Sequence, residues 1–132
     1  MAYFNEYVAR PEFTATYNGL SDQQYVNTLI GNTGVLFTPQ EHDALVNGLQ
    51  NHTETRATVL RKITEKDTFR AAEFNSMFVL MEYFGYLRRN PDPQGFGFWL
   101  NKLNQFNGDF IAAEMVKGFL MSNEYRGRFG NP

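Results

Sequence analysis

The chain has 132 residues, a mass of 15.2 kDa and a formal net charge of −2, which fits one domain of ordinary size or two small repeats that share a core. A pI near 5.6 and balanced charge exclude the basic footprint of a nucleic-acid-binding protein. The absence of cysteine excludes disulfides, thiolate metal sites and cysteine nucleophiles. The longest apolar run falls far short of the roughly 18 residues that a membrane span needs.

Aromatic residues make up 16% of the chain, with 13 Phe, 7 Tyr and 1 Trp. Aromatic side chains bury large areas, so this composition favours a Phe-rich core that stabilises a modest fold. The alternative interpretation is that some of the aromatic residues form a surface for a ligand or a partner.

Apolar residues recur at spacings of three and four between breaks marked by glycine and proline. No segment alternates between apolar and polar residues as a half-buried strand would. The pattern predicts an all-α fold of about six to seven helices. We expect helices at residues 22–31, 39–50, 54–66, 69–88, 93–105 and 109–121, with a short one at 123–128.

Local start signals agree with three of these helices. Ser21 and Gln24 have the spacing of a capping box, in which each side chain bonds the backbone N–H of the other residue. The run Thr38-Pro39-Gln40-Glu41 places a cap, a proline at the first helical position and a glutamate at the third. Asp92-Pro93 repeats the cap and proline.

Three of the predicted helices carry apolar stripes that we expect to face the core. The stripes are Phe74, Met77, Phe78, Met81 and Phe84; Phe96, Trp99, Leu100 and Leu103; and Ala112, Met115, Val116, Phe119 and Leu120.

A repeat of 56 residues is predicted from three similar stretches, residues 7–13, 63–69 and 119–125. Each opens with an apolar residue and closes six positions later with an aromatic one, at Phe13, Phe69 and Tyr125. We therefore expect a single helical domain over 1–132, with the tail of a preceding repeat at 1–13 and repeats at 14–69 and 70–130. One shared core is expected, because a unit of this size is marginal alone. On the same grounds we expect the chain to be a C-terminal fragment of a larger protein.

The second repeat carries an ordered set of motif residues. They are Pro91, Asp92, Gly95, Phe98, Trp99, Phe119, Ser122, Glu124 and Tyr125. This set resembles the bacterial family of domains of unknown function numbered four-two-one-four, which is similar in turn to the linker domains of phycobilisomes. The resemblance covers residues 69–130 and departs at Arg89-Asn90, where the family has Gly-Arg. Residues 14–68 match only through a degenerate repeat that lacks the Pro-Asp-x-x-Gly motif and the Trp.

The resemblance implies a helical module near the C-termini of large bacterial proteins that are secreted or held at the cell surface. It implies no known catalytic activity, so we expect a structural or interaction module that is not an enzyme. Its expected partners are another protein or the neighbouring domains of the parent chain, and nucleic acid is not expected as one. We predict no catalytic residues, no cofactor and no membrane span.

The alternative function is binding of a small ligand, either a surface glycan or calcium. Asn90, Asp92 and Gln94 are oxygen-bearing residues at alternate positions before a glycine, which is faintly like a calcium loop. Two prolines and the absence of a glutamate at the twelfth position weaken this interpretation. His42 and His52 are ten residues apart, a spacing that gives no local support for a shared metal. Trp99 is better explained as a core anchor than as a sugar platform.

Overall fold

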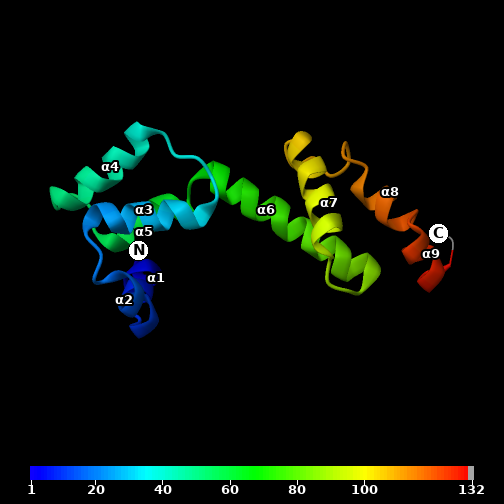
Figure 1. Cartoon of the computed structure of the whole chain (residues 1–132), viewed down its shortest axis with the longest axis horizontal. Coiled ribbons are helices and arrows are strands. Elements are labelled where there is room, and N and C mark those ends of the chain that lie inside the picture. The colour runs from blue at the N-terminus through cyan, green and yellow to red at the C-terminus, as the bar shows by residue number, and fades with distance from the viewer. Residues whose placement is uncertain (131–132) are drawn as a thin grey trace. The chain divides into compact units, whose positions relative to one another are not determined.

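The computed structural model describes residues 1–130 of the chain (Figure 1). This part contains nine α-helices and one π-helix and no strand, which confirms the all-α fold. None of its helices has the length and apolar character needed to cross a membrane. The chain divides into two compact units, Met1–Arg70 and Ala71–Pro132, one residue away from the predicted repeat boundary.

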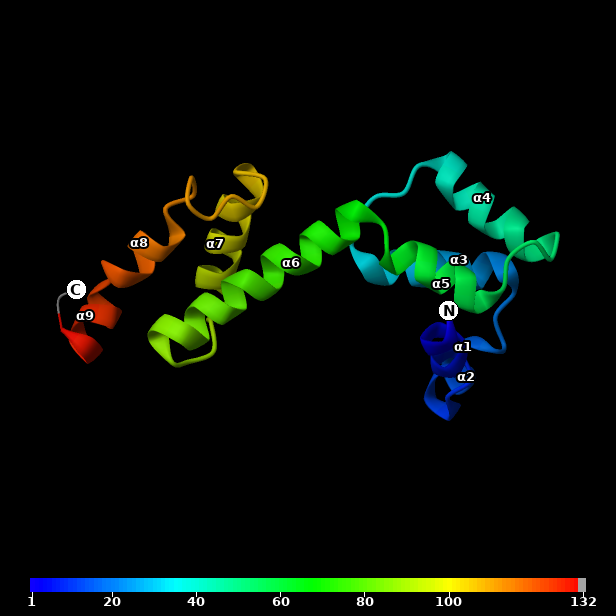
Figure 2. The same cartoon turned by 180° about the vertical axis from the view of Figure 1, so that it is seen from behind.

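The first unit contains five helices, followed by the start of a sixth. They are α1 (Ala2–Val8), α2 (Pro11–Tyr17), α3 (Asp22–Thr33), α4 (Pro39–Gln50) and α5 (Arg56–Thr64). Helices α3, α4 and α5 each begin with a capping box, whose first residues are Ser21, Thr38 and Thr55. Helix α5 packs against α1, α3 and α4, and is therefore the central helix of this unit (Figure 2).

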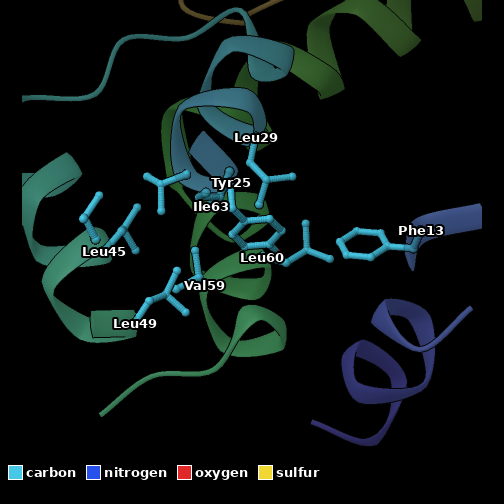
Figure 3. Close-up of a cluster of buried hydrophobic side chains, with 10 residues drawn as sticks. Phe13, Tyr25, Leu29, Leu45, Leu49, Val59, Leu60 and Ile63 are labelled. Carbon is cyan, nitrogen blue, oxygen red and sulfur yellow. The ribbon is translucent and has the colours of Figure 1, made fainter. Parts of the chain in front are cut away.

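The core of the first unit is built around the fully buried Tyr25 of α3. Figure 3 shows its ring between Phe13 of α2 on one side and Leu45 and Leu49 of α4 on the other. The other buried members are Val26, Leu29, Val46, Val59, Leu60 and Ile63. The Tyr25 hydroxyl donates to the backbone oxygen of Arg56 at 2.8 Å, so the buried phenol has its hydrogen bond satisfied.

The second unit contains four α-helices and one turn of π-helix. They are α6 (Asp67–Glu82, which begins at the end of the first unit), η1 (Tyr83–Leu87), α7 (Pro93–Gln105), α8 (Met115–Leu120) and α9 (Asn123–Phe129). Its buried cluster comprises Val79, Tyr83, Leu87, Leu103, Ala113, Met115 and Phe119. This unit therefore has a hydrophobic core of its own.

Most of the predicted helices agree with the structure, and 39–50 and 93–105 agree at both ends. Helices α1 and α2 were missed, although Pro11 at the first position of α2 repeats the proline of the signal that predicts α4. The prediction of a helix from residue 109 was wrong, since the helix begins only at Met115. Asp109 Oδ1 accepts two backbone N–H groups in a turn, and Glu114 has a left-handed φ of 50° that interrupts the helix.

The predicted core stripe on α6 is wrong for four of its five residues, and only Phe78 packs against the core. Phe74, Met77, Met81 and Phe84 are 48–63% exposed. The face of the helix that is buried instead carries Asn75, Val79, Glu82 and Tyr83. The stripes on α7 and α8 do face the core, through Leu103 on α7 and through Met115 and Phe119 on α8.

Buried positions recur between the units. Ala57, Val59 and Ile63 lie 56 residues before Ala113, Met115 and Phe119, and all six are buried. This recurrence supports the repeat, which stays a prediction. We expected one shared core, and the buried residues form two clusters, one in each unit. Residues 131–132, which the predicted domain includes, lie outside the described residues.

Candidate functional site

The motif residues of the second unit gather around the turn that joins η1 to α7. Asp92 is the N-cap of α7, and its Oδ1 accepts from the backbone N–H of Gly95 at 2.8 Å. Pro93 follows at the first helical position, where a missing N–H costs nothing. Gly95 has no room for a side chain, because a Cβ there would overlap the Tyr83 hydroxyl.

An arginine next to this turn joins it to the last helix. The Arg89 guanidinium donates to both carboxylate oxygens of Glu124 on α9, at 2.7 and 2.9 Å. It also donates to the backbone oxygen of Asn90 at 2.9 Å, and it lies 3.5 Å from Asp92 Oδ2 and 5.0 Å from the Tyr83 ring centre. Paired N–H···O bonds of this kind fix geometry as well as adding energy.

The charges in this network stabilise one another. Hydrogen bonds from Arg89 lower the pKa of Glu124, and the backbone N–H of Gly95, aided by Arg89, lowers the pKa of Asp92. Burial raises the pKa of the Tyr83 phenol, so it stays protonated. At neutral pH both carboxylates are therefore ionised and both are occupied by donors within the unit.

The remaining motif residues pack α7 against α8 and α9. The Trp99 ring stacks on Phe119, with centroids 5.1 Å apart. Gly118 makes this possible, because a Cβ there would overlap the Trp99 ring. Ser122 is the N-cap of α9 and accepts from the backbone N–H of Tyr125 at 3.1 Å.

Phe98 differs from the other motif aromatics because it is 59% exposed. It lies on the outer face of α7, where it lines a shallow hollow of about 340 Å³ together with Asn101, Lys102, Gln105 and Phe106. Pro91 lies in the turn before α7 and is half-buried. Together the motif residues cap the starts of α7 and α9, pack α7 against α8, and leave Phe98 facing outward.

The residues of the predicted calcium loop are placed in a way that favours a helix cap over a metal site. The Asp92 carboxylate is shared between the helix start and Arg89, and the backbone oxygen of Asn90 accepts from the same guanidinium. A cation placed among Asn90, Asp92 and Gln94 would meet this positive charge. Among residues 1–130 no group of three or more His, Asp or Glu side chains is arranged to hold a metal ion.

The two histidines do not come together in a site. His42 on α4 bonds Asp43 at 3.0 Å and Asn27 at 2.7 Å, which is a surface arrangement. His52 lies in the turn after α4 with a left-handed φ of 56°. Another hollow, of about 370 Å³, lies along α1 and α2, with Tyr7, Arg10 and Tyr17 in its lining.

Sequence analysis missed two features of the second unit. The first is the ion pair between Arg89 and the motif residue Glu124, for which the opposite charges of the two side chains were the available signal. The exposed stripe on α6 was interpreted as core, because periodicity shows an apolar face without showing which way it points.

A family model described as a domain of unknown function (DUF4214) matches residues 62–129, from the end of α5 to the end of α9. The chain belongs to this family. The DUF4214 match includes every motif residue from Pro91 to Tyr125, so it agrees with the resemblance seen in the sequence. No curated protein and no solved structure shows significant similarity to the chain.

Proposed function

We propose that this chain is a non-catalytic module that mediates protein–protein assembly or attachment. The observation that carries the proposal is the apolar stripe on α6 and η1, formed by Phe74, Met77, Met81 and Phe84, which we call the α6 stripe. Each of the four side chains is about half to two-thirds exposed.

Four large apolar side chains on one helix face are unlike the single exposed apolar residues common on protein surfaces. Their exposure is not a by-product of filling the core. The core of the second unit is completed by the opposite face of the same helix, through Val79 and Tyr83. A contiguous apolar surface of this kind is typical of a site where another protein docks.

The polar chemistry of the unit supports the same proposal. Arg89 and the charged motif residues Asp92 and Glu124 satisfy one another and hold helix ends together. These residues therefore serve as a scaffold that joins the turn after η1 to α7 and α9. In this proposal the module belongs to a secreted or surface-attached bacterial protein, as the family resemblance suggests, and its partner is another protein or a neighbouring domain of the parent chain.

Site-specific photo-crosslinking tests the proposal. A photoreactive phenylalanine replaces Met81 in the α6 stripe, and in a matched control it replaces Asn101 on the exposed face of α7. Irradiation in cells that make the protein should give a discrete crosslinked product from position 81, with none from position 101. Equal products from both positions, or none from position 81, would contradict the proposal.

The second candidate function is binding of a surface glycan, with calcium as a further ligand to test. The hollow along α1 and α2 favours a glycan, because it combines the aromatic faces of Tyr7 and Tyr17 with the charges of Arg10 and Glu12. Sugars bind through such a combination of stacking and polar contacts.

A thermal melt in chelator, then with calcium, then with a panel of cell-wall glycans distinguishes this candidate from the first. A ligand at a hundred times its Kd adds roughly 2.7 kcal/mol to the free energy of unfolding, which raises Tm by several degrees. A saturable rise with one glycan would support the candidate, and a Tyr7→Ala variant should abolish that rise. A panel without any rise would contradict it.

A further inference from the structure

The spacing of the α6 stripe specifies the kind of surface that fits it. Phe74, Met77, Met81 and Phe84 stand at intervals of three, four and three residues, which is the a–d–a–d pattern of two heptads. Side chains at these positions form a seam along one side of a helix. Such a seam packs best against another helix that carries the same spacing, because each knob needs a hole between four residues of the partner.

We propose that the α6 stripe is the interface of a homodimer, in which α6 of one copy packs antiparallel against α6 of a second copy. The inference rests on the proposed function and names its partner. A two-fold interface must be complementary to itself. The stripe meets this condition, because a two-fold axis midway along it pairs Phe74 with the partner's Phe84, and Met77 with the partner's Met81.

The charges at the ends of the stripe do not distinguish the parallel from the antiparallel arrangement. No charged residue lies on the exposed face between Phe74 and Phe84. In a parallel pair, Arg70 of one copy would meet the partner's Arg70 in the next layer along the seam. In an antiparallel pair, Arg70 would meet the partner's Arg88, which is also positively charged.

The exposed area is sufficient for a weak dimer. The four side chains are 48–63% exposed, and a fully exposed Phe or Met has roughly 200 Å² of surface, so the stripe offers about 450 Å² per copy. Two copies would bury about 900 Å² from the stripes alone, close to the minimum of about 1,000 Å² for a specific interface, and the exposed parts of flanking residues add to this area. We therefore expect association at high micromolar concentrations.

Helix α3 of the first unit provides an internal comparison. If the Thr38-Pro39 and Asp92-Pro93 helix starts are aligned, α3 aligns with α6 at an offset of 54 residues, two fewer than the 56 of the predicted repeat. The two methionines at the centre of the stripe, Met77 and Met81, then correspond to Gln23 and Asn27, which are exposed and polar. The central residues of the seam are therefore apolar only in the second unit.

Sedimentation velocity of the full chain, from about 10 μM to about 1 mM, tests the inference. The wild-type mass should rise with concentration from 15.2 kDa toward twice that value. The double variant Met77→Gln, Met81→Asn places the residues of α3 in the seam and should weaken association at least tenfold. Phe98→Gln removes an equally exposed aromatic from α7 and should leave association unchanged.

A charge pair tests the orientation. Chains with Met77→Glu and chains with Met81→Lys should each be monomeric alone. When they are mixed, an antiparallel dimer brings Glu at position 77 against Lys at position 81 of the other chain, so heterodimers should form. A parallel dimer would keep these charges apart, and the mixture would remain monomeric.

These results distinguish a failure of the homodimer from a failure of the proposed docking function. A wild-type chain that stays monomeric throughout, or a dimer that survives the Met77→Gln, Met81→Asn double variant, would overturn the homodimer. A monomer that still gives a discrete heterologous crosslink from position 81 would leave the docking function standing. Circular dichroism at low concentration should be the same for all variants, which excludes unfolding as the cause of lost association.

Discussion

The two units differ most clearly in how an arginine fixes their helices. In the first unit Arg56 donates to the backbone oxygens of Tyr17 and Leu20, both at 2.6 Å, and its guanidinium lies 4.8 Å from the centre of the Tyr25 ring. In the second unit Arg89 donates to a carboxylate, that of Glu124. The Arg56 contacts use acceptors that carry no net charge, and the Arg89 contacts depend on an ionised carboxylate. We call these two sets of contacts the arginine locks of the first and the second unit.

The units differ also in what they bury and expose. The second unit buries the carboxyl group of Glu82, whose Oε2 has no hydrogen-bond partner, and it exposes the α6 stripe. Within residues 1–70 the first unit buries no polar or charged side chain, and the corresponding face of α3 is polar at its centre. A helix that buries an acid and exposes methionines loses stability as an isolated unit. This loss is what we expect where a surface is maintained for a partner.

The largest expected difference between the units concerns two helical glycines. Gly118→Ala places a methyl group against the Trp99 ring and should cost about 1–3 kcal/mol in the free energy of unfolding. Gly31→Ala lies in α3 with no atom near the new methyl group and should stabilise the chain by about 0.5–1 kcal/mol. Urea denaturation of both variants measures the two changes.

The opposite signs make this comparison decisive. Gly127→Ala on α9 is a control within the second unit, since its Cβ would also meet no atom and should not destabilise. If Gly118→Ala were neutral, the Trp99 stack on Phe119 would not be the tight contact described above. If Gly31→Ala destabilised the chain, the space around Gly31 on α3 would not be open as described.

Burial of Glu82 should make the stability of the second unit depend on pH. Burial raises the pKa of its carboxyl above the ordinary value of 4.5. As the pH rises above 4.5, the unfolded chain loses this proton first, so the contribution of Glu82 to stability falls until the folded carboxyl also ionises. Glu82→Gln should therefore stabilise the chain at neutral pH by about 1 kcal/mol, with the gain disappearing toward pH 4.5.

Urea denaturation across this pH range measures the gain. Glu41→Gln on α4 is the matched control, because a hydrogen bond from Lys66 lowers the pKa of Glu41 and the variant should change stability with the opposite sign. A Glu82→Gln variant that is less stable than wild type at neutral pH would contradict the prediction.

Local signals predicted the helices whose starts are set by adjacent residues. The N-caps Thr38 and Asp92, each followed by proline, fix the starts of α4 and α7, and both helices were predicted at both ends. The turn before α8 could not be predicted in this way, because the left-handed φ at Glu114 follows from how residues 109–114 fold back. Apolar spacing alone predicted a continuous helix there.

The site was predictable where it is local, as in the caps Asp92 and Ser122. The pair between Arg89 and Glu124 joins residues 35 positions apart, so no periodicity contains it. The buried face of α6 could not be predicted from the sequence for a different reason. Its buried face includes polar Asn75, whose Nδ2 donates to the Asn104 side chain at 2.8 Å, so the most apolar face of the helix is not the face that packs.

The smallest expected effect is a difference between the two arginine locks in how their contribution to the free energy of unfolding changes with pH. The Arg89 hydrogen bonds lower the pKa of Glu124 below 4.5, so the contribution of the pair is complete above pH 4.5 and is lost as the pH falls through the lowered pKa. Glu124→Gln should cost at most about 1 kcal/mol at pH 7, because the side chains are about one-third exposed. At about pH 3, below the ordinary pKa of a glutamate, the cost should be smaller than at pH 7.

Arg56→Lys in the first unit is the matched variant. Its acceptors are backbone oxygens, which do not titrate, so its cost should be the same at both pH values. Urea denaturation of the two variants at both pH values measures the difference. Equal costs for Glu124→Gln at neutral and acid pH would show that the second lock does not depend on an ionised carboxylate. The two units would then be held by the same kind of contact.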